Sequence, residues 1–198
     1  MTLKQRKTPI QPRAQASVAA IMEAAAQILE REGTAGFNTN KVALRAGVSI
    51  GTLYQYFPNK GALMVALINQ SLSGLSARIT DIAKQSEGLT FDETLRLFVR
   101  AAVAHQMARP ELERLLDVEE RYLAMGEDHD NIERRIVGQI IGTLAHHNAA
   151  PTMTNLESTA RDVAAIASAL IDAAAERGER DAVVIEDRIV RAVRGYLA

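Results

Sequence analysis

The sequence predicts an all-α protein of about nine helices. Nearly every long segment carries apolar residues at helical spacing, which is the primary signal for amphipathic helices. Aromatic residues make up only 4% of the chain, and runs of alternating β-branched residues are absent. Alanine is abundant, and it is the strongest helix former. The 198 residues fit one ordinary domain or two small ones that share an interface.

Composition excludes several classes of protein. The chain has no cysteine, so it can form neither a disulfide nor a thiolate metal site. No run of about 18 uncharged apolar residues exists, and the basic N-terminus lacks the apolar stretch of a secretory signal. We expect a soluble, cytoplasmic protein with no membrane partner and no cofactor.

Charge is unevenly distributed along the chain. Residues 1–70 carry a net charge of +5 and the remainder −6, so the overall −1 hides a basic end on an acidic body. A basic end suits a polyanion partner, although such asymmetry is also common on ordinary solvated surfaces.

The first elements follow from local signals. Residues 1–12 contain two prolines and predict a flexible basic arm. A helix follows over about residues 13–32, and Gly33 ends it. Its apolar stripe consists of Val18, Ile21, Ala25, Ile28 and Leu29.

Two short helices come next. Thr39 is the expected N-cap of the first and Gly47 ends it. The second begins after Ser49 and ends at Phe57, because Pro58 follows.

Longer helices occupy the rest of the chain. Asn59 is expected to cap a helix that runs to about residue 85. Thr90 and Glu93 have the spacing of a capping box at the start of a helix that runs to residue 109, and Thr154 with Glu157 repeats that spacing. The remaining helices are predicted over about residues 110–126, 128–147, 155–177 and 182–197.

The two short helices and the turn "AGVS" between them form a helix-turn-helix pattern. Gly47 lies where the turn needs a left-handed backbone. Leu53 and Phe57 are four residues apart, and with Val48 they are expected to pack the second helix onto its neighbours. The opposite face is expected to display Ile50, Gly51, Thr52, Tyr54, Gln55 and Tyr56.

That display suits a helix that reads DNA in the major groove. Ile50 can contact a thymine methyl group, Gly51 permits close approach, and Thr52 and Gln55 can hydrogen-bond to bases or phosphates. The tyrosine hydroxyls can reach phosphates, and helix starts also favour anions. The alternative is that the tyrosines pack inside the protein and that Thr39 and Ser49 are only caps. The predicted DNA-binding residues are Thr39, Lys41, Arg45, Ser49, Ile50, Gly51, Thr52, Tyr54, Gln55, Tyr56 and Lys60.

Residues 17–68 resemble the N-terminal domain of the tetracycline-repressor (TetR) family. The resemblance rests on "IMEAAAQILEREG", "NTNKVALRAGVSIGTLYQYFPNKGAL" and "MVALI". It implies a DNA-binding domain over residues 13–68 and a helical effector-binding and dimerisation domain over residues 69–198. It also implies a repressor that a small-molecule effector releases from its double-stranded DNA operator. Asn38, where a threonine is common, and Gly61, where a glutamate is usual, depart from the pattern.

By the same resemblance, two sets of residues match the family's DNA contacts. The matching phosphate-contact positions are Thr39, Tyr54, Tyr56 and Lys60. The matching groove-facing positions are Ile50, Gly51, Thr52 and Gln55.

Two C-terminal stripes indicate helix packing. Apolar residues from 156 to 174 are separated by 4, 3, 4, 3 and 4 positions, as in a helix-packing seam. The stripes can pack in the chain's own core or form a four-helix interface in a homodimer. A dimer is favoured because it reads two half-sites about 34 Å apart. The expected interface residues are Val163, Ala167, Leu170, Ala174, Ile189 and Val193.

The sequence says less about other sites. Phe98, His105 and Tyr122 are candidates for binding the implied effector, although the first interpretation of Phe98 and Tyr122 is that they are ordinary core residues. No metal site is expected, because no segments converge on a histidine; His129 lies at an acidic helix start. No catalytic constellation is visible, so an enzyme is not expected. The alternatives are a helix-rich interaction protein and an all-α small-molecule-binding protein, and salt-dependent binding to DNA separates both from a regulator.

Overall fold

The computed structural model describes residues 12–150 and 155–198. Over these residues the chain forms nine α-helices and no strand, which confirms the predicted fold class. The helices are α1 Pro12–Gly36, α2 Thr39–Arg45, α3 Ile50–Tyr56, α4 Lys60–Gln85, α5 Phe91–Ala108, α6 Pro110–Glu120, α7 Glu127–His146, α8 Leu156–Glu176 and α9 Ala182–Leu197. The predicted N-terminal arm lies outside the described residues, apart from Pro12. Within the described ranges, no helix is long and apolar enough to cross a membrane.

The chain divides into two compact units. The N-terminal unit comprises residues 1–71 and 111–129, and the C-terminal unit comprises residues 72–110 and 130–198. The sequence predicts a single division after residue 68, but α6 belongs to the first unit. The reason is that α6 buries Leu112 and Leu116 in the same apolar core as α1 and the start of α4.

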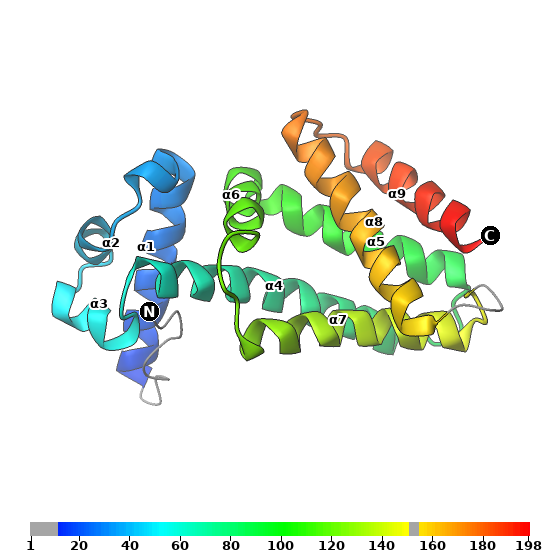
Figure 1. Cartoon of the computed structure of the whole chain (residues 1–198), viewed down its shortest axis with the longest axis horizontal. Coiled ribbons are helices and arrows are strands. Elements are labelled where there is room, and N and C mark those ends of the chain that lie inside the picture. The colour runs from blue at the N-terminus through cyan, green and yellow to red at the C-terminus, as the bar shows by residue number, and fades with distance from the viewer. Residues whose placement is uncertain (1–11, 151–154) are drawn as a thin grey trace. The chain divides into compact units, whose positions relative to one another are not determined.

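The core of the N-terminal unit fixes α2 and α3 against α1. Figure 1 shows the two short helices next to α1, with which both are in contact. Ile21 and Leu29 of α1 are fully buried with Leu53 of α3 and with Phe57, which follows α3 directly. Burying a side chain of this size stabilises a fold by about 1.5–3 kcal/mol. The helix-turn-helix therefore packs against α1 through a shared apolar core.

Helix starts in this unit follow local capping. Ser49 caps α3 as predicted, since its hydroxyl accepts a hydrogen bond from the backbone N–H of Thr52 at 3.0 Å. The prediction that Thr39 caps α2 is wrong. The N-cap is Asn38, whose side-chain oxygen accepts from the backbone N–H of Lys41 at 2.9 Å. Asparagine is among the strongest N-cap residues, so the helix begins one position earlier. Gly47 has the expected positive φ of 67°.

Other predicted boundaries are confirmed or shift slightly. The capping box of Thr90 and Glu93 is present at the start of α5. Helix α6 ends at Glu120 instead of near Gly126. The N-cap of α8 is Asn155, which accepts from two backbone N–H groups. Thr154, the predicted cap, lies outside the described residues.

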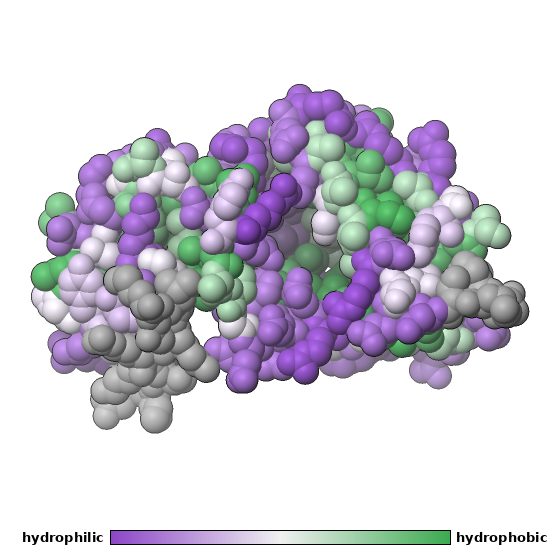
Figure 2. Space-filling model, viewed as in Figure 1, coloured by the Kyte–Doolittle hydropathy of each residue, from purple (hydrophilic) through white to green (hydrophobic). Residues whose placement is uncertain are grey.

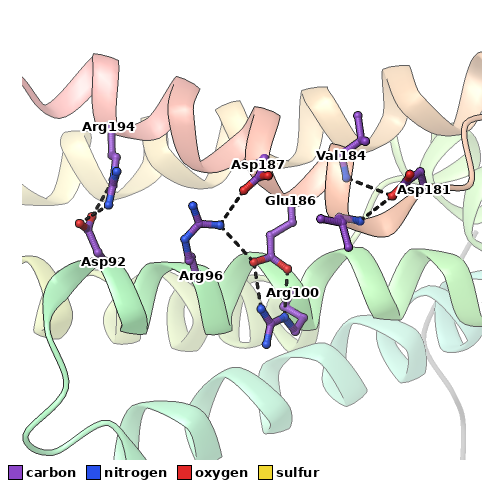
Figure 3. A network of polar contacts seen from close by, with 9 residues as sticks. Asp92, Arg96, Arg100, Asp181, Val184, Glu186, Asp187 and Arg194 are labelled. Atoms are coloured by element: carbon purple, nitrogen blue, oxygen red, sulfur yellow. Dashed lines mark hydrogen bonds and ion pairs between the residues drawn. The ribbon is translucent and has the colours of Figure 1, made fainter.

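In the C-terminal unit, α5, α8 and α9 pack against one another around an apolar core. A polar network also joins α5 to α9 (Figure 3). Glu186 of α9 is buried and accepts hydrogen bonds from Arg100 at 3.0 and 3.1 Å and from Arg96 at 3.4 Å. Arg194 of α9 pairs with Asp92 at the start of α5. These contacts fix the register of α9 along α5.

Candidate nucleic-acid interface

Helix α3 has one buried side and one exposed side. Leu53 and Tyr56 lie in the core of the N-terminal unit, while Ile50, Tyr54 and Gln55 are exposed. The prediction that Tyr56 stands on the exposed side is wrong, because its exposed fraction is only 7%. Positions 53 and 56 are three residues apart and share one helix face, so Tyr56 turns inward with Leu53.

A pair of hydroxyl groups lies beside the exposed side of α3. The hydroxyl oxygens of Thr39 and Tyr54 are 3.1 Å apart, which joins the first residue of α2 to the middle of α3. The Tyr54 side chain is 41% exposed, so it is accessible from solvent as well as held by Thr39. One of the two hydroxyls donates to the other, so the remaining O–H of the pair can be donated to an anion.

At the start of α3, the Ser49 hydroxyl is fully used as a cap, whereas Gly51 leaves the helix surface uncovered. Besides accepting from the Thr52 backbone, the Ser49 hydroxyl lies 2.8 Å from the Thr52 hydroxyl, so these two side chains satisfy each other. A Cβ atom added at Gly51 would meet only Ser49 Oγ, at an ordinary 3.7 Å. The fold itself therefore does not need glycine at this position. Its effect is to leave the outer surface of α3 open to a close neighbour.

The predicted cations are engaged within the protein. Lys41 forms an ion pair with Glu32, and Arg45 Nε donates to the side-chain oxygen of Gln27 at 2.7 Å. Lys60 Nζ donates to a backbone carbonyl, that of Thr34, at 3.1 Å. All three cations are exposed, and an exposed ion pair such as Lys41–Glu32 contributes only about 0–1 kcal/mol.

Sequence reasoning missed one exposed apolar side chain beside these cations. Leu44 of α2 is 83% exposed, next to Arg45. Val42, Ala43 and Ala46 face the core, and Leu44 lies between them on the opposite side of the helix. The helical period alone therefore predicts that Leu44 is exposed.

The predicted dimer interface is largely internal to the chain. Val163, Ala174, Ile189 and Val193 have exposed fractions of 6%, 1%, 0% and 0%, and they lie in the core of the C-terminal unit. The prediction that these four contact a second chain is therefore wrong. The regular spacing packs α8 against α5 and α9 of the same chain. Ala167 and Leu170 are half-buried against the same core.

The three predicted effector-binding residues belong to different units of the chain. Phe98 is buried and His105 half-buried, and both lie on α5 in the C-terminal unit. Tyr122 belongs to the N-terminal unit and is 83% exposed. It follows α6 directly, in a segment that the sequence predicts as helix.

Comparison with known proteins identifies both parts of the chain. Residues 21–67 match the family described as "Bacterial regulatory proteins, tetR family". Residues 90–197 match "Tetracyclin repressor-like, C-terminal domain".

Similar proteins and structures agree with these matches. The nucleoid occlusion factor SlmA of Vibrio atlanticus is 33% identical over 97 residues, which is 48% of each chain. The alignment thus spans about half the length of this relative. The fatty acid metabolism regulator protein of Bacillus subtilis is 30% identical over 79 residues, or 40% of each chain.

Solved structures show the same fold over nearly the whole chain. The FadR regulator of B. subtilis, solved in complex with stearoyl-CoA, superposes with a TM-score of 0.74 at 17% identity. The superposition covers 90% of this chain and 98% of FadR. A TetR-family regulator from Streptomyces coelicolor gives a TM-score of 0.66 at 20% identity, covering 91% and 97% of the two chains. With a helix-turn-helix at one end and a matching C-terminal domain at the other, this chain belongs to the tetR family of DNA-binding bacterial regulators.

Proposed function

We propose that this regulator is a dimeric repressor that inserts α3 into the major groove of its operator. A small-molecule effector then releases the repressor from the operator. The observation that carries the proposal is the shape of α3. Its inner side chains are fixed in the core, and its outer side presents Ile50, Gly51 and Gln55 without a charge among them. A helix of this kind fits the major groove, where the edges of all four base pairs are distinguishable.

In this proposal the side chains of α3 divide into two roles. Gln55 hydrogen-bonds to a base edge, and Ile50 contacts a thymine methyl group. Gly51 lets the helix backbone approach the bases closely. The hydroxyls of Tyr54 and Thr39 bind a phosphate and fix the orientation of the helix, since phosphate contacts position a protein without specifying sequence.

The cations supply affinity in this proposal. Lys41, Arg45 and Lys60 exchange their exposed partners in the free protein, a carboxylate, an amide oxygen and a backbone carbonyl, for phosphates; exposed contacts of these kinds contribute only about 0–1.5 kcal/mol. Each phosphate that is neutralised releases counterions, so affinity falls as salt rises. Tyr56 has no direct contact with bases in this scheme, because its ring lies in the core.

We place the dimer contact on the outer side of α8. Ala169 is exposed and Ala173 half-buried on this side, and Ile166 and Leu170 lie at its edges, where they also pack against the core of their own chain. In the space-filling view, apolar residues gather along α8 in the C-terminal unit (Figure 2). Alanines among them allow a partner helix to approach closely. A dimer related by a twofold axis would bring two recognition helices to successive half-sites.

The effector is expected in the C-terminal unit, with Phe98 and His105 of α5 as the candidate contacts. An acyl-CoA is the first class to test, because the FadR structure with the same fold contains stearoyl-CoA. Double-stranded DNA as the partner implies that the protein acts in the cytoplasm. No catalytic role is part of this proposal.

The test begins with selecting bound duplexes from a random pool and measuring their affinity by fluorescence anisotropy. We expect affinity to fall by about a thousandfold or more between about 50 and 200 mM salt. Added stearoyl-CoA should release the duplex, whereas free coenzyme A should not. An affinity for the duplex that does not change with salt concentration would refute groove docking. Salt-dependent binding that no acyl-CoA releases would refute only the effector class.

A further inference from the structure

His129 is a buried histidine on the N-terminal unit's segment of α7. Only 4% of its surface is exposed, although the acids around it in "EDHD" predict a solvated helix start. Its ring lies between side chains from two other helices of the same unit, Asn69 of α4 and Glu120 of α6. The prediction that no segments converge on a histidine is therefore wrong at this position.

Both ring nitrogens of His129 face an oxygen atom. Nδ1 lies 3.2 Å from Asn69 Oδ1, and Nε2 lies 3.0 Å from Glu120 Oε1. A neutral imidazole has a single N–H and can donate to only one of them. With Nδ1–H donating to Asn69, Nε2 faces the Glu120 carboxylate and can carry either a second proton, which it donates to Glu120, or a metal ion that Glu120 binds as well.

The surroundings of His129 match those of a metal-binding histidine. Such a residue typically donates its second ring N–H to an oxygen acceptor, which fixes the tautomer and the orientation of the ring. Asn69 is placed to accept this hydrogen bond. Two ligand atoms that each bind an ion at about 2.1 Å are separated by about 2.9–3.4 Å at angles of about 90–110°. The observed 3.0 Å between Nε2 and Glu120 lies within that range.

A third ligand is available on the same helix as the histidine. Glu133 follows His129 by one turn of α7, so the two side chains share a helix face, and its carboxylate is exposed. We infer that Glu120, His129 and Glu133 bind one divalent transition-metal ion, with Asn69 as the residue that positions the ring. One imidazole and two carboxylates suit Zn²⁺ or Mn²⁺. The ion would link α6 to the first two turns of α7.

The test is calorimetric titration of the untagged, metal-stripped protein with zinc chloride alone. His146 and His147 have adjacent rings, with centroids 4.7 Å apart, and are a second source of zinc binding. The titration therefore uses the His146→Gln, His147→Gln double variant as its background. We expect one zinc ion per chain, with affinity reduced at least about a hundredfold by His129→Gln and about tenfold or more by Glu120→Gln or Glu133→Gln.

Glu127→Gln, at an exposed acid at the start of α7, is the matched control and should leave zinc affinity unchanged. At the same zinc concentration, zinc should also raise the melting temperature of the background protein more than that of Glu133→Gln, whose exposed position leaves the fold intact. If His129→Gln does not fold, the two glutamate variants still decide the outcome. Absence of zinc binding in the background protein would overturn the inference. So would a zinc affinity in Glu120→Gln and Glu133→Gln that equals the affinity of the background protein.

Discussion

The hydroxyl oxygens of Thr39 and Tyr54 lie 3.1 Å apart, although 15 positions separate the residues in the sequence. The contact joins the first turn of α2 to the exposed side of α3. Because Asn38 already caps α2, the Thr39 hydroxyl is available to Tyr54. The relative placement of the two helices thus sets the position of the tyrosine hydroxyl that we expect to bind a phosphate.

Tyr54→Phe should weaken binding to every duplex by a similar factor. Loss of one hydrogen bond corresponds to about 0.5–1.5 kcal/mol, or about a two- to tenfold loss of affinity. Thr39→Val should have a similar effect. The double variant should lose less binding free energy than the two single variants together, because both hydroxyls bind the same phosphate. Fluorescence anisotropy measures all three. Tyr196→Phe is the matched control, since that tyrosine bonds Asp162 in the C-terminal unit. Unchanged affinity in Tyr54→Phe would contradict the phosphate contact.

Gln55→Ala should change which sequences are bound. A well-formed contact to a base edge discriminates by about 1–3 kcal/mol, so preference at one operator position should relax. Ile50→Ala should weaken preference for thymine at another position. Repeating the duplex selection with each variant measures these changes. Neither variant removes a charge, so the dependence of affinity on salt should stay as in the parent protein. The same selected sequence in parent and Gln55→Ala would exclude Gln55 from base reading.

Ala169→Glu should convert the dimer to a monomer. The side chain is exposed on the outer side of α8, so the substitution adds charge to the proposed contact without disturbing the protomer's core. Sedimentation velocity measures the change, and circular dichroism checks that the helices remain. Ala104→Glu, at an exposed alanine of α5, should leave the dimer intact. A dimer that persists in Ala169→Glu would move the interface away from this side of α8.

Local signals in the sequence predict most helix boundaries. Ser49, Gly47 and the Thr90–Glu93 pair each act through backbone groups within a few residues, so their effects need no knowledge of the rest of the fold. Asn38 shows the limit of this reasoning, because two adjacent residues can both cap and the choice shifts the helix by one position.

Contacts between distant segments were much less predictable. The seam through Val163 and Ala174 has the same spacing whether its partner helix belongs to the same chain or to a second one, and the structure shows that it is internal. Tyr56 has a polar tip, which favours the surface, yet its ring is buried beside Leu53. His129 carries acidic neighbours in the sequence, and only the folded chain brings Asn69 and Glu120 to its ring.

Glu93→Gln should reduce the dependence of stability on acidic pH. In the folded protein the pKa of Glu93 lies below its usual 4.5, because the carboxylate accepts hydrogen bonds from the backbone N–H and then the hydroxyl of Thr90. A carboxylate with a lowered folded pKa stabilises the fold above its unfolded pKa, and that contribution disappears as pH falls through the folded value. Melting temperatures measured across this acidic range should fall less in Glu93→Gln than in the parent. Glu87→Gln, at an exposed loop glutamate, is the control. Parallel curves for Glu93→Gln and the parent would contradict the prediction.

Glu186→Ala should destabilise the C-terminal unit more than removal of its neighbour does. Glu186 is 7% exposed and accepts from both Arg96 and Arg100, so its loss leaves two guanidinium groups without their buried acceptor. The arginine side chains are 40% and 64% exposed, and water compensates part of the loss. We therefore expect about 1–3 kcal/mol, below the cost of breaking a fully buried pair. Asp187→Ala removes an exposed partner of Arg96 and should cost less than about 1 kcal/mol. Urea unfolding followed by circular dichroism compares the two variants, and equal losses would show that burial of Glu186 adds nothing to the network.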